Sequence, residues 1–329
     1  MYRCGNLKVL ISTFPFAERD RTPLDLLEKY SINYVINPFG HKLTEEELIS
    51  LIGDFDAIIA GTEPITDRVM AHASKLKLIS RVGIGLDSVD LLSAKNRNIA
   101  VSYTPDAPSE AVAELTLGLM LASLRSIHVA NNEMHCGEWY RHTGRRLSEC
   151  VVGIIGVGRI GSMVLHHLSG FNCKKVMLND LYITIEKESD MDVEWHTKDD
   201  ILRTADVITL HVPLTRQTKS MITRAELEMM KPDAILINTA RGGIIDEVDL
   251  YNVLMEDHLG GIAIDTFETE PYKGRLATID RCLLTAHMGS MSADCRARME
   301  IEATQEAVRL ISGETLISMA PLEEYENQR

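Results

Sequence analysis

Three side chains able to act on a carbonyl compound each follow an apolar run in the second half of the sequence. Arg241 comes after AILINTA, Glu270 after GIAIDTFET, and His287 at the end of CLLTAH. An arginine can hold a carboxylate with two parallel hydrogen bonds, which a lysine cannot match. A histidine titrates near neutral pH, and a carboxylate beside it fixes its ring. The three types predict a site that binds an organic acid and moves a proton at its carbonyl or hydroxyl oxygen.

A glycine-rich turn upstream predicts a dinucleotide site. The string VVGIIGVGRIG places Gly156, Gly158 and Gly161 in GxGxxG spacing, between a β-rich run and an amphipathic helical pattern. The first glycine permits a tight turn, the second lets the backbone approach a pyrophosphate, and the third brings helix and strand together. The next run ends in Asp180, where a carboxylate accepts hydrogen bonds from a ribose and repels a 2′-phosphate. NAD is therefore the expected cofactor, although methyltransferases and flavoproteins have related turns.

The stretch NTARGG, residues 238–243, combines small residues with a single arginine. We expect Thr239 and Ala240 to let the nicotinamide half of NAD pass close to the backbone. Gly242 and Gly243 are expected to leave room for the substrate and to let the chain turn. Asp265 is placed to accept a hydrogen bond from the nicotinamide carboxamide.

Each signal taken alone also fits a structural role. A lone histidine is more often structural than catalytic, acidic residues in a loop are usually solvated, and a glycine-rich turn need not bind a ligand. The joint placement of an arginine, a carboxylate and a histidine behind a dinucleotide fingerprint favours hydride transfer between a nicotinamide and a carbonyl.

The elements that must position these residues are short strands alternating with helical patterns, which is typical of parallel sheets covered on both faces. The first set of expected strands is 8–13, 33–37, 56–61, 76–83 and 99–103. The second set is 151–156, 175–180, 206–212, 234–239, 261–267 and 282–287. Thr44 and Glu47 form a capping box at one helix start. The fold class is α/β, with two doubly wound parallel-sheet domains.

The segment 108–134 is expected to form one long helix. It has no internal proline beyond its start, and apolar residues cover nearly its whole circumference between Val112 and Leu124, which predicts burial on all sides. A subunit interface is one way to bury it. The tail from about Met291 is helical again and offers apolar residues for docking on the first domain. We expect a discontinuous substrate domain, 1–104 and 291–329, and an NAD-binding domain, 105–290.

Composition narrows the class of partner. The chain has 329 residues, with 34 basic and 48 acidic side chains and a net charge of −14. This balance argues against nucleic acid or an anionic membrane as partner, so an anionic substrate must meet a few placed arginines. The six cysteines show no metal-ligand spacing, and no metal is expected. With no signal region or bilayer-length apolar run in view, the expected location is the cytoplasm.

Several strings closely resemble the D-isomer-specific 2-hydroxyacid dehydrogenase family. They are GIIGVGRIG, LHVPLT, MKPDAILINTARGGIIDEVDL, AIDTFETEP and TAHMGS, and the resemblance continues upstream through RVGIGLDSVDL and YTPDAPSEAVAELTLGLML. It implies a Rossmann NAD-binding domain inserted in a flavodoxin-like substrate domain, and a homodimer built through helix 108–134. One departure is Ala286, which stands where the family usually has a proline and could loosen the turn before His287.

The resemblance also implies roles for individual residues. Arg241 is the carboxylate anchor, Glu270 the partner of the histidine, and His287 the acid and base. The backbone of Val82, Gly83 and Ile84 meets the substrate carboxylate. The implied cofactor contacts are Gly156, Gly158, Arg159, Ile160, Gly161, Asp180, Val212, Pro213, Thr239, Ala240, Asp265, His287 and Gly289.

The choice of hydroxy acid stays open. The N-terminal half looks most like 3-phosphoglycerate dehydrogenases, and Arg81 and Arg141 could bind a second anionic group of the substrate. Against this, Ala60 stands where a phosphate-binding arginine would be expected, and Arg81 could equally be an interdomain charge. The substrate is 3-phosphoglycerate or another anionic 2-hydroxy acid, or else glyoxylate and hydroxypyruvate. A different class, an NAD(H)-sensing binding protein like the corepressors that share this fold, is the alternative.

Overall fold

A computed structural model of the protein describes residues 7–183 and 192–328. The chain divides into two compact units. One comprises the described residues up to Pro108 together with those from Ser290 onward, and the other is Ser109–Gly289. The chain passes from one unit to the other after Pro108 and returns after Gly289. The boundaries expected from the sequence were after residues 104 and 290. The second unit is thus an insertion in the chain of the first.

The first unit is built on a five-stranded parallel sheet. Its strands are β1 (Lys8–Ile11), β2 (Asn33–Ile36), β3 (Ala57–Ala60), β4 (Leu78–Arg81) and β5 (Ala100–Ser102). Their order is β2-β1-β3-β4-β5, and every pairing is parallel. This is the flavodoxin-like order, in which the chain reverses direction across the sheet between β1 and β3. Strands β3 and β4 are buried along their full length, as expected where both faces are covered.

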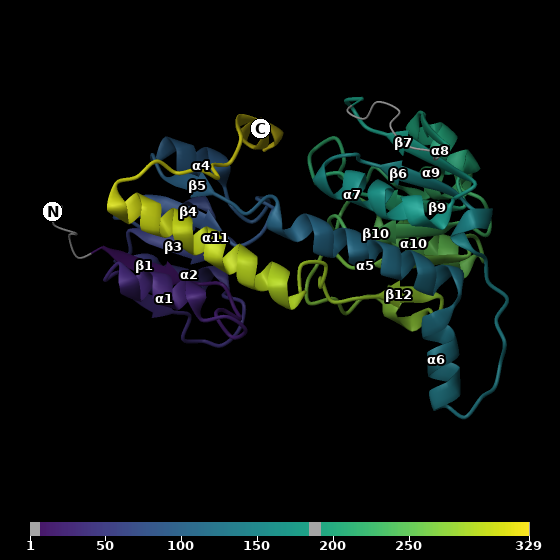
Figure 1. The fold of residues 1–329 in the computed structure, drawn as a ribbon, viewed down its shortest axis with the longest axis horizontal. Coiled ribbons are helices and arrows are strands. Elements are labelled where there is room, and N and C mark those ends of the chain that lie inside the picture. The colour runs from purple at the N-terminus through teal and green to yellow at the C-terminus, as the bar shows by residue number, and fades with distance from the viewer. Residues whose placement is uncertain (1–6, 184–191, 329) are drawn as a thin grey trace. The chain divides into compact units, whose positions relative to one another are not determined.

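Helices cover this sheet, and the last long one returns from the far end of the sequence. The helices of the first unit are α1 (Thr22–Lys29), α2 (Glu45–Ile52), α3 (Asp67–Ala71), α4 (Leu91–Asn96), α11 (Ala293–Ser312) and α12 (Leu322–Asn327). The capping box of Thr44 and Glu47 at the start of α2 is confirmed. Helix α11 packs on β3, β4 and α1 (Figure 1). The buried Ser80 hydroxyl donates to the Ala303 carbonyl at 2.8 Å.

The second unit is built on a seven-stranded parallel sheet. Its strands are β6 (Val151–Ile155), β7 (Lys175–Asn179), β8 (Val193–Trp195), β9 (Val207–Leu210), β10 (Ile235–Asn238), β11 (Gly261–Ile264) and β12 (Cys282–Leu284). The order β12-β11-β10-β9-β6-β7-β8 contains the Rossmann arrangement, with its reversal between β6 and β9. Two parallel-sheet domains were predicted, and this fold class is confirmed. Strand β8 was not predicted, because a three-residue edge strand with one exposed and two half-buried residues carries little apolar pattern.

The helices of the second unit flank this sheet. They are α5 (Ala107–Leu124), α6 (Ile127–His135), α7 (Arg159–Leu168), α8 (Lys198–Thr204), α9 (Arg224–Met229) and α10 (Glu247–Met255), with short 3₁₀ turns η1 (Leu147–Glu149), η2 (Ser169–Phe171) and η3 (Arg275–Thr278). Among the described residues, no single helix has the length and apolarity to cross a membrane, and only α5 and α6 taken together, bent by 64°, reach that length.

The prediction of one long helix over 108–134 was wrong. The helix breaks at Ser126, which has a positive φ of 50°, and α6 leaves at an angle to α5. At the break, the Leu124 carbonyl accepts the Arg145 N–H at 3.1 Å, and Gly144 packs so closely that a Cβ there would lie 2.3 Å from the same oxygen. The Leu124 carbonyl, which would otherwise accept the next hydrogen bond of the helix, is thus used by a segment about twenty residues later in the chain. In the single chain α5 is only partly covered and α6 has no buried residue, so burial on all sides stays a prediction that a partner copy would have to complete.

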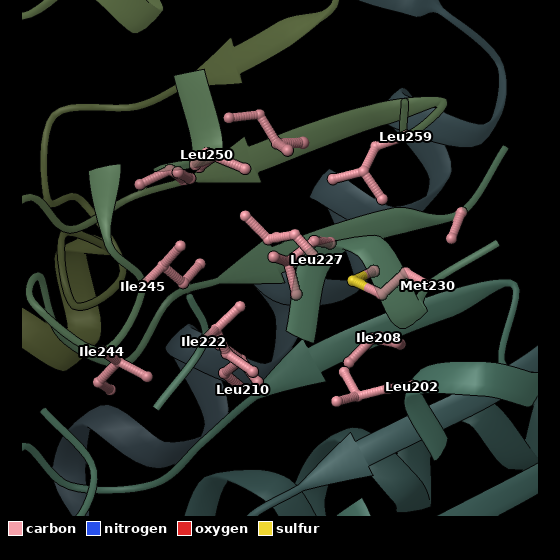
Figure 2. Packing of buried hydrophobic residues seen from close by; sticks show 14 of the residues in the cluster. Leu202, Ile208, Leu210, Ile222, Leu227, Met230, Ile244, Ile245, Leu250 and Leu259 are labelled. Carbon is pink, nitrogen blue, oxygen red and sulfur yellow. The ribbon is translucent and has the colours of Figure 1, made fainter. Parts of the chain in front are cut away.

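The second unit holds a large apolar cluster between β9–β11 and helices α8–α10. Figure 2 shows its packing, with Leu202, Ile208, Leu227 and Met230 pointing toward one another. Ile208 is fully buried in the middle of β9.

Replacing Ile208 with alanine should leave a cavity and lower the free energy of unfolding by about 2–5 kcal/mol. A lower urea midpoint by circular dichroism is the expected result. Val248→Ala, on the exposed face of α10, is the control and should shift stability by less than about 0.5 kcal/mol. Equal midpoints for the two variants would contradict the burial of Ile208.

Candidate active site

The parallel register brings three strand ends together at one edge of the seven-stranded sheet. Asn238 of β10 pairs with Ile264 of β11, and Ile264 pairs with Leu284 of β12. The polar residues that follow these strands therefore leave the sheet at the same level, on its carboxyl edge, which is where α/β sheets bind ligands. Arg241, Glu270 and His287 all follow these three strands.

His287 and Glu270 form a direct pair. The ring Nδ1 of His287 lies 3.0 and 2.9 Å from the two carboxylate oxygens of Glu270. The carboxylate is itself fixed by the Phe267 N–H at 3.1 Å. Because Nδ1 faces a carboxylate, it carries the proton, and Nε2 is the nitrogen that can exchange a proton with a substrate. Both side chains keep about a third of their surface exposed, at 36% and 28%, so a small molecule can reach them.

Asp265 holds the loop that carries His287. It is 1% exposed, and its carboxylate accepts the Thr285 hydroxyl at 2.6 Å, the Met288 N–H at 2.8 Å and the Gly289 N–H at 2.9 Å. Its carbonyl accepts the His287 N–H at 2.8 Å. The contact with a nicotinamide carboxamide expected from the sequence stays a prediction, because most of this carboxylate is already engaged within the protein.

This arrangement bears on the departure at Ala286. A proline would stiffen the turn before the histidine, and its absence was expected to loosen that turn. Asp265 ties the chain on both sides of Ala286, and His287 adopts a positive φ of 49°. A strained backbone at a functional residue persists where its surroundings hold it, and here the hydrogen bonds to one buried carboxylate do so.

Arg241 is positioned by the end of β10. The Asn238 side chain bridges the loop, donating to the Arg241 carbonyl at 2.8 Å and accepting the Ala240 N–H at 3.1 Å. The Arg241 guanidinium donates to the Ala240 carbonyl at 2.7 Å. The Thr239 hydroxyl lies 2.8 Å from that of Thr116, which ties the loop to α5. Sequence reasoning did not single out Asn238 or Thr116 as supports of this loop.

Position 242 requires a glycine for a different reason from the one expected from the sequence. A Cβ there would lie 2.0 Å from the carbonyl carbon of Phe267 and 2.3 Å from the Glu268 nitrogen. Glycine is thus needed for the loop after β10 to lie against the loop after β11, and its absent side chain does not leave substrate room. Gly243 has a φ of 79° and makes the turn. The two glycines bring Arg241 near the backbone that presents Glu270.

The glycine-rich turn after β6 has the geometry of a phosphate cradle. A Cβ on Gly156, whose φ is 94°, would meet the His211 backbone at 2.6 Å, and one on Gly161 would meet the Gly156 carbonyl at 2.0 Å. Gly158 has nothing within 4 Å on its open side, and it begins α7 with no side-chain cap. Helix N-termini bind anions through their first backbone N–H groups, so the uncapped start of α7 at Arg159 and Ile160 fits a dinucleotide pyrophosphate.

Asp180 lies beside this turn. It follows β7, and its carboxylate accepts the Val157 N–H at 2.6 Å and the Tyr182 N–H at 3.3 Å. On the other side of β6, Val212 and Pro213 follow β9, so these residues flank the point where strand order reverses. That point is where doubly wound sheets bind nucleotides, and a negative charge there favours NAD over NADP.

A second histidine, His211, also follows a strand end and could in principle be the proton donor. Part of the residue reaches solvent, but its ring Nδ1 is buried without a partner among the described residues, and Nε2 lies 2.9 Å from the Thr209 hydroxyl. Burial lowers the pKa of His211 to about 3. It has no carboxylate partner in the described structure and stays neutral near pH 7, so His287 is the better candidate for proton transfer.

The expected substrate-binding residues lie apart in the chain. Arg81, at the end of β4, is 6% exposed and donates to the adjacent Val82 carbonyl, with its guanidinium over Gly83. Gly83 has a φ of 139°, and its N–H donates to the Thr104 hydroxyl at 2.8 Å. These residues and Ile84 belong to the first unit. Arg141 belongs to the second, in an exposed stretch after α6.

No cluster of three or more histidine, cysteine or acidic side chains suited to a metal ion is found in residues 7–183 and 192–328.

Comparison with known families gives a match to a model described as D-isomer specific 2-hydroxyacid dehydrogenase, NAD binding domain, over residues 117–289. The chain belongs to this family. The family makes it an NAD-dependent oxidoreductase acting on 2-hydroxy acids and their 2-keto counterparts. The family, the NAD cofactor and the enzyme class predicted from the sequence are thereby confirmed.

Relatives within the family differ in the substrate that they are named for. The chain is 40% identical to D-3-phosphoglycerate dehydrogenase of Methanocaldococcus jannaschii, over 83% of this chain and 53% of the relative, so it spans about half of that enzyme. It is 33% identical to hydroxypyruvate reductase of Thermotoga maritima, over 85% and 94% of the two chains. Among solved structures, the TT0316 protein of Thermus thermophilus matches with a TM-score of 0.87 and 30% identity, covering 96% of this chain and 100% of that one.

Gly242→Ala should disable the site without touching a reacting group. The added Cβ collides with backbone at Phe267, so the two loops must separate, and kcat should fall by at least about tenfold together with a loss of stability of about 1–3 kcal/mol. Gly170→Ala is the matched control, since a Cβ there has nothing within 4 Å. Steady-state NADH oxidation and thermal melting measure both effects, and normal kinetics for Gly242→Ala would rule out the packing described.

Proposed function

We propose that the protein catalyses reversible hydride transfer between NAD and the C2 carbon of a D-2-hydroxy acid, with Arg241, Glu270 and His287 as the acting residues. The observation that carries this is the Glu270–His287 pair on the same sheet edge as Arg241, beside a glycine-rich dinucleotide turn. The relatives' names support 2-keto acids as the compounds that are reduced.

Each residue has one task in the reduction of a keto acid. Arg241 binds the substrate carboxylate through two charge-assisted hydrogen bonds and orients the neighbouring carbonyl. NADH, when bound, supplies the hydride that forms the new C–H bond at C2. The imidazolium of His287 gives its Nε2 proton to the carbonyl oxygen, which becomes the hydroxyl. In the oxidation, neutral His287 takes that proton back.

Glu270 makes this proton exchange possible. Its carboxylate holds Nδ1 and so turns Nε2 outward, and its negative charge stabilises the imidazolium that must exist before the proton is given. The net charge of −14 gives no general attraction for a keto acid anion. The placed guanidinium of Arg241 must therefore supply the local positive potential.

We propose that the cofactor binds along the carboxyl edge of the seven-stranded sheet, at the reversal of strand order between β6 and β9 and beside the strands that follow it. Arg159 and Ile160 begin the helix that would meet the pyrophosphate, and Asp180 would accept the ribose hydroxyls. Val212, Pro213, Thr239, Ala240 and Gly289 lie on the carboxyl ends or following loops of β9, β10 and β12, where the nicotinamide half would pass.

His287→Gln should lower kcat by about 10²- to 10⁴-fold while NADH binding, followed by protein fluorescence, is retained. Arg241→Ala should lower kcat/KM by about 10²- to 10³-fold, mainly through KM, and Arg241→Lys should recover only part of the loss because lysine cannot bind in two places. Rates of NADH oxidation with glyoxylate, pyruvate, hydroxypyruvate and 3-phosphohydroxypyruvate provide the measurement. His72→Gln, an exposed histidine of the first unit, is the control.

Tight NADH binding without turnover of any of these keto acids would overturn the proposed enzyme. It would favour the alternative of an NAD(H)-sensing binding protein, which needs the dinucleotide turn but no proton donor.

We further propose that two copies associate through α5, α6 and the stretch that follows. Helix α6 has no buried residue in the single chain, and it exposes Ile127 and Met134 by more than half. Trp139 and Tyr140 are exposed by 75% and 66%. Surface aromatic and aliphatic residues gathered in one segment are typical of an interface.

The double variant Ile127→Glu, Met134→Glu should shift the protein from dimer to monomer in analytical ultracentrifugation, because two charges cannot be buried there unpaired. Val248→Glu, equally exposed on α10, should leave the mass unchanged. A wild-type protein that sediments as a monomer at micromolar concentration would refute the proposed interface.

A further inference from the structure

The first residue of helix α10 contacts the loop that presents Glu270. Helix α10 begins at Glu247, and the Oε1 atom of Glu247 accepts the Glu268 N–H at 2.8 Å. The N-cap residue Asp246 already accepts two N–H groups of the first turn, so Glu247 is not needed as the cap of its own helix. Its side chain instead joins the loop after β10 to the loop after β11, and both loops belong to the second unit.

This contact fixes the peptide between Phe267 and Glu268. A Cβ on Gly242 would lie 2.3 Å from the Glu268 nitrogen, so the loop after β10 packs closely against the same peptide. The neighbouring Phe267 N–H donates to Glu270 at 3.1 Å, and Glu270 in turn holds Nδ1 of His287. Two consecutive N–H groups are thus each held by a carboxylate. A shift at the Glu268 N–H would therefore move the Phe267 N–H and the carboxylate that it holds.

Glu247 also places a negative charge where a charge is unfavourable. The residue is half-buried, and burial together with the nearby carboxylates of Glu268, Asp246 and Glu270 raises the pKa of Glu247. The same charge also acts on Tyr272. A backbone N–H needs only an oxygen atom as acceptor, which a neutral glutamine also provides. The hydrogen bond to Glu268 thus does not by itself account for a carboxylate at position 247.

We infer that Glu247 is a positioning residue for proton transfer: it fixes the loop that presents Glu270 and adds a second negative charge beside the Glu270–His287 pair. The inference rests on the proposed function and goes beyond its three acting residues. A second carboxylate stabilises an imidazolium further, so His287 keeps its proton to higher pH. The guanidinium of Arg241, which follows β10 at the same sheet edge, acts in the opposite direction, and the charge of Glu247 offsets part of its effect.

Glu247→Gln separates the charge from the hydrogen bond, since the amide oxygen can still accept the Glu268 N–H. In keto acid reduction, which needs the imidazolium, the fall of kcat/KM with rising pH should have its midpoint lower by about half a pH unit. The NMR titration of the His287 ring in the free protein, assigned by its loss in His287→Gln, should shift by the same amount. Glu247→Ala also removes the acceptor, so kcat should fall at least about tenfold at every pH, and Glu247→Gln should recover most of that loss at low pH.

Glu149→Gln is the matched control. Glu149 also accepts a backbone N–H, from Arg146 at 2.9 Å, but it lies just before β6 and therefore at the opposite, amino edge of the sheet. This variant should leave both midpoints as in the wild type. Thermal melting confirms that each variant is folded, and if Glu247→Ala does not fold, the two midpoints of Glu247→Gln still decide.

Equal midpoints in Glu247→Gln and the wild type, or an equal shift in Glu149→Gln, would overturn the inference while leaving the dehydrogenase intact. A wild type that reduces no keto acid would instead overturn the proposed function, and the NMR titration would still measure the effect of the Glu247 charge on His287.

Discussion

The site depends most on one buried carboxylate, that of Asp265 at the end of β11. Its three accepted hydrogen bonds fix the loop after β12, and its own carbonyl holds the His287 backbone in a positive-φ conformation. A buried charge is tolerable only when its lone pairs are satisfied, so the loop and the aspartate stabilise each other. His287 reaches Glu270 because the hydrogen bonds to Asp265 fix the backbone of the loop that carries the histidine.

Much of the fold could be predicted from the sequence because its determinants are local. Strands such as β9, β10 and β11 are continuous apolar runs, and parallel sheets covered on both faces require that pattern. The break between α5 and α6 could not be predicted, since neither proline nor glycine marks it. Its cause is a hydrogen bond from Arg145, a residue about twenty positions later that packs there only in the folded unit.

The features of the candidate site likewise fall into those that are visible in the sequence and those that depend on tertiary contacts. The glycine spacing and the order of Arg241, Glu270 and His287 are visible in the sequence because each follows its own strand. The burial that neutralises His211 and the contact that requires Gly242 are not visible, because each depends on residues that are distant in the sequence. Residue types indicated the chemistry here, and tertiary contacts decide which member of each type performs it.

The discontinuous first unit has a consequence for the order of synthesis. Its helix α11 packs on β3 and β4, and the bond from Ser80 to Ala303 joins residues 223 positions apart. A ribosome delivers the whole inserted unit before that helix emerges. The nascent five-stranded sheet must therefore wait without α11 over β3 and β4 while the seven-stranded unit has all its strands, so the second unit can finish folding first and the first unit last.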